Sequence, residues 1–209
     1  TVNTPKPLAR VHGVRIIDRL IDAVMAAGID EIYIVRGYLA EEFDQLLHKY
    51  PNLRFIDNPL YGETNNISSA LAACEHFERA YVFLTNPALV SKYQFQSNYL
   101  GFPVQKTDDW CFDANGDGVI ENLAKGKDAP CWQMVGLSFW TAADGARLAR
   151  DIPEVFERED AKQIFWDDVA IVRRADDYAV HVRECSPDDI LEIDDFDDLQ
   201  RIDPSYIVR

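Results

Sequence analysis

The stretch RIIDRLIDAVMAAGIDEIYIVRG, residues 15–37, decides the fold because it joins a helix directly to a strand. Apolar side chains recur at i, i+3, i+4 and i+7 over residues 17–24, which predicts an amphipathic helix. Gly28 favours the left-handed conformation that often ends a helix. The apolar run at residues 32–35 predicts a parallel strand, covered on both faces, that ends at Gly37. Ligands of open α/β sheets bind beyond the carboxyl ends of the strands, so we expect the functional site there.

Charge and composition exclude several classes of function. The 209 residues carry a formal net charge of −15, with no basic stripe for nucleic acid and no apolar run long enough to span a membrane. The acidity fits a small cationic substrate, although it also serves solubility alone. The four cysteines are scattered, and the first residues lack a secretory pattern. We therefore expect reduced thiols, no zinc site and a cytoplasmic location.

Helices and strands alternate through the first 84 residues. The patterns predict a helix over 39–47, a strand over 53–56, a helix capped by Asn65 or Asn66 that runs to residue 77, and a strand over 80–84. This order is typical of a doubly wound, mostly parallel, Rossmann-like α/β sheet.

The pattern changes after residue 86. Aromatic residues and turn signals over 93–140 predict an antiparallel excursion laid over the ligand edge of the sheet. Further along, the spacing predicts helices over 142–149 and 163–173, an edge strand over 178–182, and a last helix capped by Asp195. We see no linker or repeat, so one domain is expected.

The sequence DANGDG, residues 113–118, resembles the start of a calcium-binding loop. The twelfth position of such a loop requires a bidentate Glu, and Ala124 stands there. Asn-Gly and Asp-Gly favour the positive φ of hairpin turns, so a hairpin is the better interpretation.

Two groups near the strand ends are candidates for a nucleotide site. Lys6 lies between two prolines that would hold its ammonium towards a phosphate, although an ordinary solvated lysine is the alternative. Asn65, Asn66, Ser68 and Ser69 cluster at a helix start. Amide groups suit the edge of a nucleobase, and plain helix capping is the alternative.

Acidic residues beside tryptophans form two further candidates. Asp167 and Asp168 follow Trp166 within an apolar run, where buried carboxylates need a partner such as a divalent cation; a surface face is the alternative.

Trp110 directly follows Asp108 and Asp109, and an indole beside carboxylates suits an ammonium ligand. Packing of this indole in the core is the alternative.

Taken together, these motifs resemble the bacterial phosphocholine cytidylyltransferases, a branch of the sugar-1-phosphate nucleotidyltransferase superfamily. The resemblance implies a single domain, 1–209, of the nucleotide-diphospho-sugar transferase type, with a nucleotide-binding half (1–92) and an acceptor-binding half (93–209). TPKPL (4–8), AGIDEIYIVRGYL (27–39) and YGETNNISSALAA (61–73) carry it in the first half; SKYQFQSNYLGFPV (91–104), TDDWCF (107–112), MVGLSFWTAADG (134–145), FWDDV (165–169) and EIDDFDDL (192–199) carry it in the second. The related 2-aminoethylphosphonate cytidylyltransferases share these motifs, so the acceptor stays open.

The resemblance implies a reaction in which an acceptor phosphate or phosphonate attacks the α-phosphorus of CTP and releases pyrophosphate, with Mg²⁺ as the cofactor. It also implies residue roles. Lys6 would hold a phosphate, Asp167 would bind the metal, and the nucleotide would contact Gly37, Asn65, Asn66 and Ser68. The ammonium head of the acceptor would be received by Trp110, Asp108 or Asp109, Tyr99 and Trp166.

The sequence departs from the family in two places. The family opens with a buried strand and a glycine-rich G-x-G-x-R loop, and this sequence begins just after that point. A later strand of the family ends in a metal-binding Asp, whereas residues 80–83 run into LTNP, residues 84–87. Because loss of a central strand would leave unpaired hydrogen-bonding edges, we expect the missing strand and loop to belong to a longer protein.

Two other hypotheses stay open: a sugar-1-phosphate nucleotidyltransferase, and a non-catalytic nucleotide-binding domain of the same fold. Trp110 and its neighbouring acids argue against a neutral sugar. We expect CTP and a small cationic acceptor as partners of a monomer or homodimer.

Overall fold

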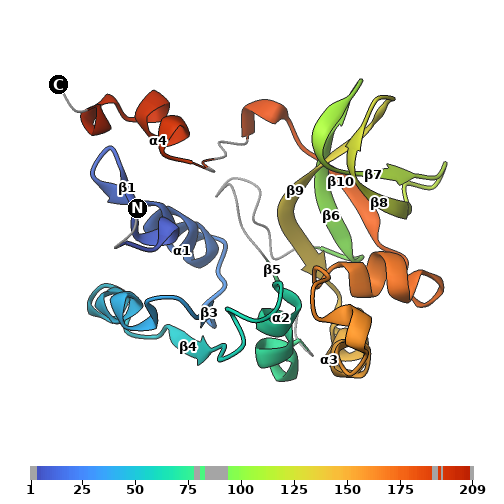
Figure 1. Ribbon diagram of the computed structural model, residues 1–209, viewed down its shortest axis with the longest axis horizontal. Helices are drawn as coiled ribbons and strands as arrows, with labels where there is room; N and C mark the ends of the chain where they lie inside the picture. Colours follow the sequence, from blue (N-terminus) through green and yellow to red (C-terminus); the bar gives the residue numbers. More distant parts are fainter. Residues whose placement is uncertain (1–3, 78–80, 83–93, 190–192, 194, 208–209) are drawn as a thin grey trace.

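The computed structural model describes residues 4–77, 81–82, 94–189, 193 and 195–207. The N-terminal helices and strands lie on one side of the molecule and a six-stranded sheet on the other, with α2 and α3 next to each other below (Figure 1). The helices are α1 (Ile16–Ala26), α2 (Ile67–Ala73), α3 (Ala142–Phe156) and α4 (Phe196–Ile202). The strands are β1 (Arg10–Val11), β2 (Val14–Arg15), β3 (Tyr33–Arg36), β4 (Arg54–Asp57), β5 (Tyr81–Val82), β6 (Asn98–Val104), β7 (Thr107–Ala114), β8 (Ile120–Lys127), β9 (Cys131–Trp140) and β10 (His181–Glu184).

The stretch that opens the sequence folds largely as its pattern predicts. Helix α1 ends before Gly28, which has a φ of +75°. Strand β3 pairs with β4 in parallel, and its two faces contact different apolar clusters: Val35 contacts the main core and Ile34 the N-terminal core. The predicted helix over 39–47 forms as a 3₁₀ helix, η2 (Ala40–His48). The helix-strand unit is therefore confirmed.

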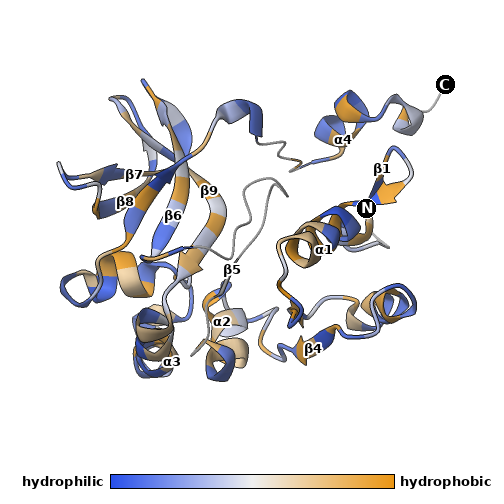
Figure 2. Cartoon of the chain, turned by 180° about the vertical axis from the view of Figure 1, so that it is seen from behind, coloured by the Kyte–Doolittle hydropathy of each residue, from blue (hydrophilic) through white to orange (hydrophobic). Residues whose placement is uncertain are grey.

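The large sheet is mixed, in the order β10-β6-β9-β7-β8, with β5 also paired to β9. Within it β10 runs parallel to β6 and the other pairs are antiparallel, which confirms the antiparallel excursion and the α/β class. Hydrophobic and hydrophilic residues are interspersed along these strands, as the mixed colours in Figure 2 show.

The strand predicted over 80–84 pairs antiparallel, whereas the predicted order of elements favours a parallel sheet. Tyr81 and Val82 pair antiparallel with Trp140 and Phe139 of the ten-residue β9, which also pairs with β6 and β7. Strands β3 and β4 form a separate two-stranded sheet. Residues 80, 83 and 84 lie outside the described residues. So do residues 84–87, where the family has its metal-binding Asp. The parallel part of the sheet is therefore smaller than predicted.

Three later elements also differ in extent from their predictions. The edge strand expected over 178–182 begins at His181, because the side chain of Tyr178 is buried and donates a hydrogen bond to Asp151 (2.8 Å). Helix α3 continues past Ala149 to Phe156, since Ile152 and Val155 are fully buried.

The helix predicted over 163–173 is reduced to one π-helical turn, η6 (Val169–Arg173). The cause is local: Asp168 accepts a hydrogen bond from the backbone N–H of Phe165 (3.0 Å), so the side chain takes a donor that a helix would use.

Two short motifs are confirmed. Residues 113–118 form the β7–β8 hairpin turn, where Asn115 accepts hydrogen bonds from the N–H groups of Asp117 and Val119. Asp195 and Asp198 form a reciprocal capping box at the start of α4. Among the described residues, no helix has the length and apolar character needed to cross a membrane.

Candidate active site

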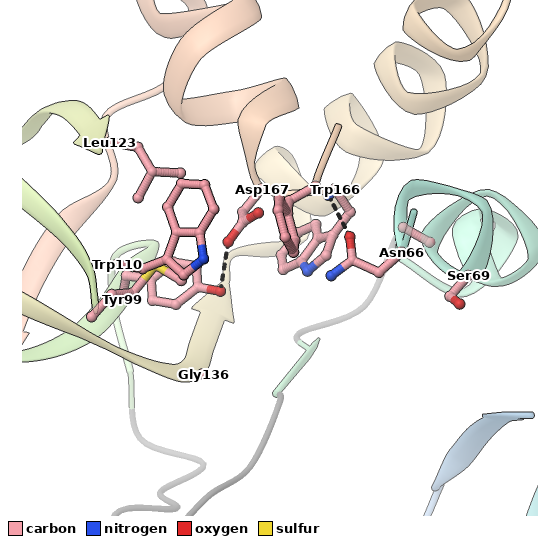
Figure 3. A pocket seen from close by; sticks show the side chains of 11 residues that line it. Asn66, Ser69, Tyr99, Trp110, Leu123, Gly136, Trp166 and Asp167 are labelled. Carbon is pink, nitrogen blue, oxygen red and sulfur yellow. Dashed lines mark hydrogen bonds between the residues drawn. The ribbon is translucent and has the colours of Figure 1, made fainter. Parts of the chain in front are cut away.

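A cavity of about 290 Å³ opens between α2, the concave side of the large sheet and the segment that precedes η6. Figure 3 shows Tyr99 and Trp110 on one side, Asn66 and Ser69 on the other, and Asp167 between them. Five of the predicted site residues line this cavity, although they lie up to 101 positions apart in the sequence: Asn66, Tyr99, Trp110, Trp166 and Asp167.

Asp167 is the buried charge of this cavity. Its side chain is 3% exposed, and its Oδ2 atom accepts a hydrogen bond from the hydroxyl of Tyr99 at 3.0 Å. Its Oδ1 atom has no hydrogen-bond partner among the residues that the structure describes. Burial raises the pKa of Asp167 to about 6; the Tyr99 hydroxyl opposes this rise, and the charge of Asp168 adds to it. One wall of the cavity thus includes a buried carboxylate that has an oxygen without a hydrogen-bond donor among the described residues.

Aromatic rings form much of the cavity wall. Trp110 and Phe165 meet edge to face with their ring centroids 5.0 Å apart. The ring of Trp166 packs edge to face against two other rings, with centroid distances of 5.7 Å to Trp140 and 6.3 Å to Phe77. These contacts fix the orientation of the wall before any ligand binds. Aromatic faces beside a carboxylate suit an organic cation.

Four hydrogen bonds connect the start of α2 to the segment that carries Asp167. The Asn65 backbone N–H donates to the carbonyl of Lys162 (3.0 Å), and the Asn65 side chain donates to the carbonyl of Gln163 (3.2 Å). The Gln163 side chain donates to the carbonyl of Glu63 (3.0 Å). Finally, Asn66 Oδ1 accepts from the backbone N–H of Trp166 (2.8 Å; Figure 3). The predicted cap is therefore wrong for Asn66, because its side chain serves this tertiary bond.

Asn58 organises the same helix start and was not among the predicted residues. It is buried, and its amide donates to the hydroxyls of Ser68 (2.8 Å) and Ser69 (3.1 Å). Ser68 is buried by this contact, and Ser69 lines the cavity. The only sequence signal was the position of Asn58 at the end of a predicted strand. Phe165 was also missed, because nothing in its local pattern distinguishes it from a core residue.

The structure places the other predicted residues elsewhere. Lys6 is exposed and lines a second cavity, of about 110 Å³, together with Asp195 and Phe196. Gly37 is packed against the ring of Tyr61, where an added Cβ would lie 2.5 Å from the ring carbon.

The acids that precede Trp110 do not line the cavity. Asp108 is exposed, and Asp109 Oδ1 accepts a hydrogen bond from the backbone N–H of Trp110 (2.7 Å). Successive side chains of a strand point to opposite faces, which separates Asp109 from Trp110. Asp108 lies where the pairing register of β7 with β8 shifts between Thr107 and Trp110, so the regular alternation does not hold there. The carboxylate that accompanies this indole in the cavity is Asp167.

The donor set around Asp167 does not fit a magnesium site. Mg²⁺ takes six oxygen ligands and keeps several waters that need polar partners. Besides Asn66, Ser69 and Tyr99, the cavity is lined mainly by apolar residues such as Leu123, Met134 and Phe165. The described part of the chain holds no group of three His, Cys, Asp or Glu side chains that could bind a metal. Asp167 is therefore not assigned as a magnesium ligand.

Comparisons with known proteins identify the family and the fold. Residues 2–87 match the MobA-like NTP transferase domain. A 2-aminoethylphosphonate cytidylyltransferase of Lancefieldella rimae is 36% identical over 99% of this chain and 87% of that protein. A choline-phosphate cytidylyltransferase of Streptococcus pneumoniae is 27% identical over 97% of this chain and 90% of that protein. The solved structure of LicC, the CTP:phosphocholine cytidylyltransferase of Streptococcus pneumoniae, superposes with a TM-score of 0.83 at 24% identity, covering 98% of this chain and 90% of that one.

The mixed, curled sheet with its flanking helices is thus an α/β nucleotidyltransferase fold. The chain belongs to the family of bacterial phosphocholine and 2-aminoethylphosphonate cytidylyltransferases, and it is a nucleotidyltransferase.

Proposed function

We propose that this nucleotidyltransferase transfers CMP from CTP to a small aminoalkyl phosphate or phosphonate and releases pyrophosphate. The names of the relatives support this acceptor class. The observation that carries the proposal is the buried carboxylate of Asp167 in an aromatic cavity, since a neutral sugar would leave that charge without a counter-ion.

The proposed chemistry needs little acid or base assistance. An oxygen of the acceptor attacks the α-phosphorus of CTP, a new P–O bond forms, and the bond to the bridging oxygen breaks. Pyrophosphate leaves with the bonding electron pair. The second pKa of a phosphate monoester is about 6, so the attacking oxygen is largely deprotonated at neutral pH. The protein's contribution is then to hold both substrates in line and to neutralise charge.

The cavity offers positioning for one of these substrates. Trp110, Phe165 and Asp167 would hold the cationic head of the acceptor. Asn66 and Ser69, at the start of α2, form the opposite wall of the cavity. The nucleotide roles expected for Lys6, Gly37, Asn65 and Ser68 stay proposals. The binding of Mg²⁺ with the triphosphate and the cytoplasmic location also stay proposals.

A crossed substrate panel tests the proposal. Pyrophosphate release is measured with CTP, ATP, UTP or GTP against phosphocholine, 2-aminoethylphosphonate or glucose 1-phosphate, each with and without Mg²⁺. We expect release only with CTP and an aminoalkyl acceptor. Release with glucose 1-phosphate would contradict the acceptor class. Failure of every pair would contradict catalysis and leave a nucleotide-binding domain.

A further inference from the structure

Asp167 divides its two oxygens between different tasks. Oδ2 is occupied by the hydroxyl of Tyr99, so the orientation of the carboxylate is fixed. Oδ1 is buried and accepts no hydrogen bond from the described residues, although it belongs to a residue that lines the cavity. A buried carboxylate oxygen without a donor is costly, and the cost is removed when a ligand supplies one. The ligand of this cavity should therefore carry a positive charge and a donor.

The cavity wall selects the kind of cation. Leu123, Met134 and the rings of Trp110 and Phe165 give the cavity that Asp167 lines a mainly apolar and π surface. A hydrated metal ion finds few polar partners there, whereas an alkylammonium group contacts π faces through its carbon atoms. The aromatic rings alone accept a primary or a quaternary ammonium equally well. The carboxylate oxygen separates the two, because a trimethylammonium group has no N–H to donate.

We propose that Asp167 Oδ1 accepts a hydrogen bond from an N–H of the acceptor's ammonium group, so that the site prefers acceptors that retain an N–H over trimethylammonium acceptors. The inference concerns the binding of the ammonium group. It rests on the proposed function only in taking that group to be part of an acceptor that receives CMP. Charge-assisted hydrogen bonds in water-excluded sites are strong, and a site built around one rejects the analogue that lacks the donor. The expected preference is at least tenfold in affinity.

Stepwise methylation of one compound tests the inference. Phosphoethanolamine, its N-methyl and N,N-dimethyl derivatives and phosphocholine differ only at nitrogen, and the first three retain at least one N–H. Their affinities for the wild-type protein are measured by titration calorimetry in EDTA, so that neither metal nor turnover contributes. We expect similar affinities for the first three and a drop of at least tenfold at phosphocholine. A gradual change, tighter binding of phosphocholine, or no binding by the series would overturn the inference.

A pair of neighbouring variants assigns the effect to one carboxylate. Asp167→Asn should weaken the binding of the three N–H compounds at least tenfold. It should also remove the break in the series, which is the drop in affinity between the dimethyl compound and phosphocholine. Asp168→Asn is the matched control, since Asp168 is occupied by the N–H of Phe165 and its amide oxygen can keep that bond. It should preserve the break. If Asp167→Asn leaves binding intact and instead raises the Mg²⁺ concentration needed for turnover, Asp167 is a metal ligand and the inference is wrong.

The two proposals fail separately. A break in the calorimetric series without CMP transfer to any acceptor would contradict the proposed function and keep the head-group assignment. Transfer of CMP to all four compounds with equal affinities would support the proposed function and contradict the head-group assignment. The wild-type series decides the question even if a variant does not fold.

Discussion

Asn66 Oδ1 accepts a hydrogen bond from the backbone N–H of Trp166 at 2.8 Å, across 100 positions of sequence. The bond fixes the residue that directly precedes Asp167 against the start of α2. The orientation of the acidic group therefore depends on a residue of the other half of the chain.

Replacing Asn66 with Ala should raise the KM of the acceptor more than it lowers kcat. The change leaves the Trp166 N–H without its partner, which costs about 1–3 kcal/mol. Steady-state kinetics and urea unfolding measure the two effects. Asn66→Asp keeps an acceptor oxygen and should restore much of the loss in stability. Equal behaviour of the two variants would contradict the role of this bond.

Gly37→Ala should destabilise the protein by about 1–3 kcal/mol, because the new Cβ would lie 2.5 Å from the Tyr61 ring carbon and 2.6 Å from its Cβ. These atoms are at the root of the side chain, so rotation of the ring gives little relief. Gly116→Ala is the control, since its Cβ would meet nothing within 4 Å. Thermal unfolding of both variants tests the prediction, and Gly37→Ala should cost much less in a Tyr61→Gly background, which removes both clashing atoms. Equal unfolding temperatures for the single variants would refute it.

Acid should weaken the β7–β8 hairpin through Asp113. The ammonium of Lys127, with help from Asn122, holds the pKa of Asp113 below its usual value in the folded protein. The lowered pKa means that this contribution to stability is present above the unfolded-state value of 3.8 and is lost as the pH falls through the lower folded value. Urea unfolding between pH 6 and about pH 3 should show a smaller acid-dependent loss in Asp113→Asn than in wild type. Asp117→Asn, in the same hairpin, is the control and should lose stability as wild type does.

Trp110→Ala should raise the KM of the acceptor far more than the KM of CTP, because the indole faces the proposed head-group site. Trp110→Phe retains a π face and should lie between wild type and the Ala variant. An equal effect of Trp110→Ala on both substrates would count against the aromatic cavity.

The sequence predicts well what local patterning determines. Gly28 ends α1, Asp195 caps α4, and DANGDG turns a hairpin, because each depends on residues within a few positions. The family resemblance predicted separate roles for Trp110 and Asp167, one at the acceptor and one at a metal. Their common cavity depends on tertiary packing.

What the sequence missed depends on distant partners. The partnership of β5 with β9 joins segments about 60 positions apart, and no local signal specifies it. Asp108 and Asp109 were expected beside Trp110 because they adjoin it in sequence, whereas the fold brings Asp167 to the indole. Asn66 has the pattern of a cap, and a tertiary bond overrides it.

The central claim is that the protein joins CMP to an acceptor whose cationic head lies beside Asp167. ³¹P NMR of the protein with CTP, Mg²⁺ and 2-aminoethylphosphonate tests it most directly. The account predicts that the signals of CTP and of the free phosphonate fall together while pyrophosphate and a coupled pair of signals from a new P–O–P linkage appear. A CTP spectrum that stays unchanged, or decays to CMP or CDP with the phosphonate signal intact, would contradict it.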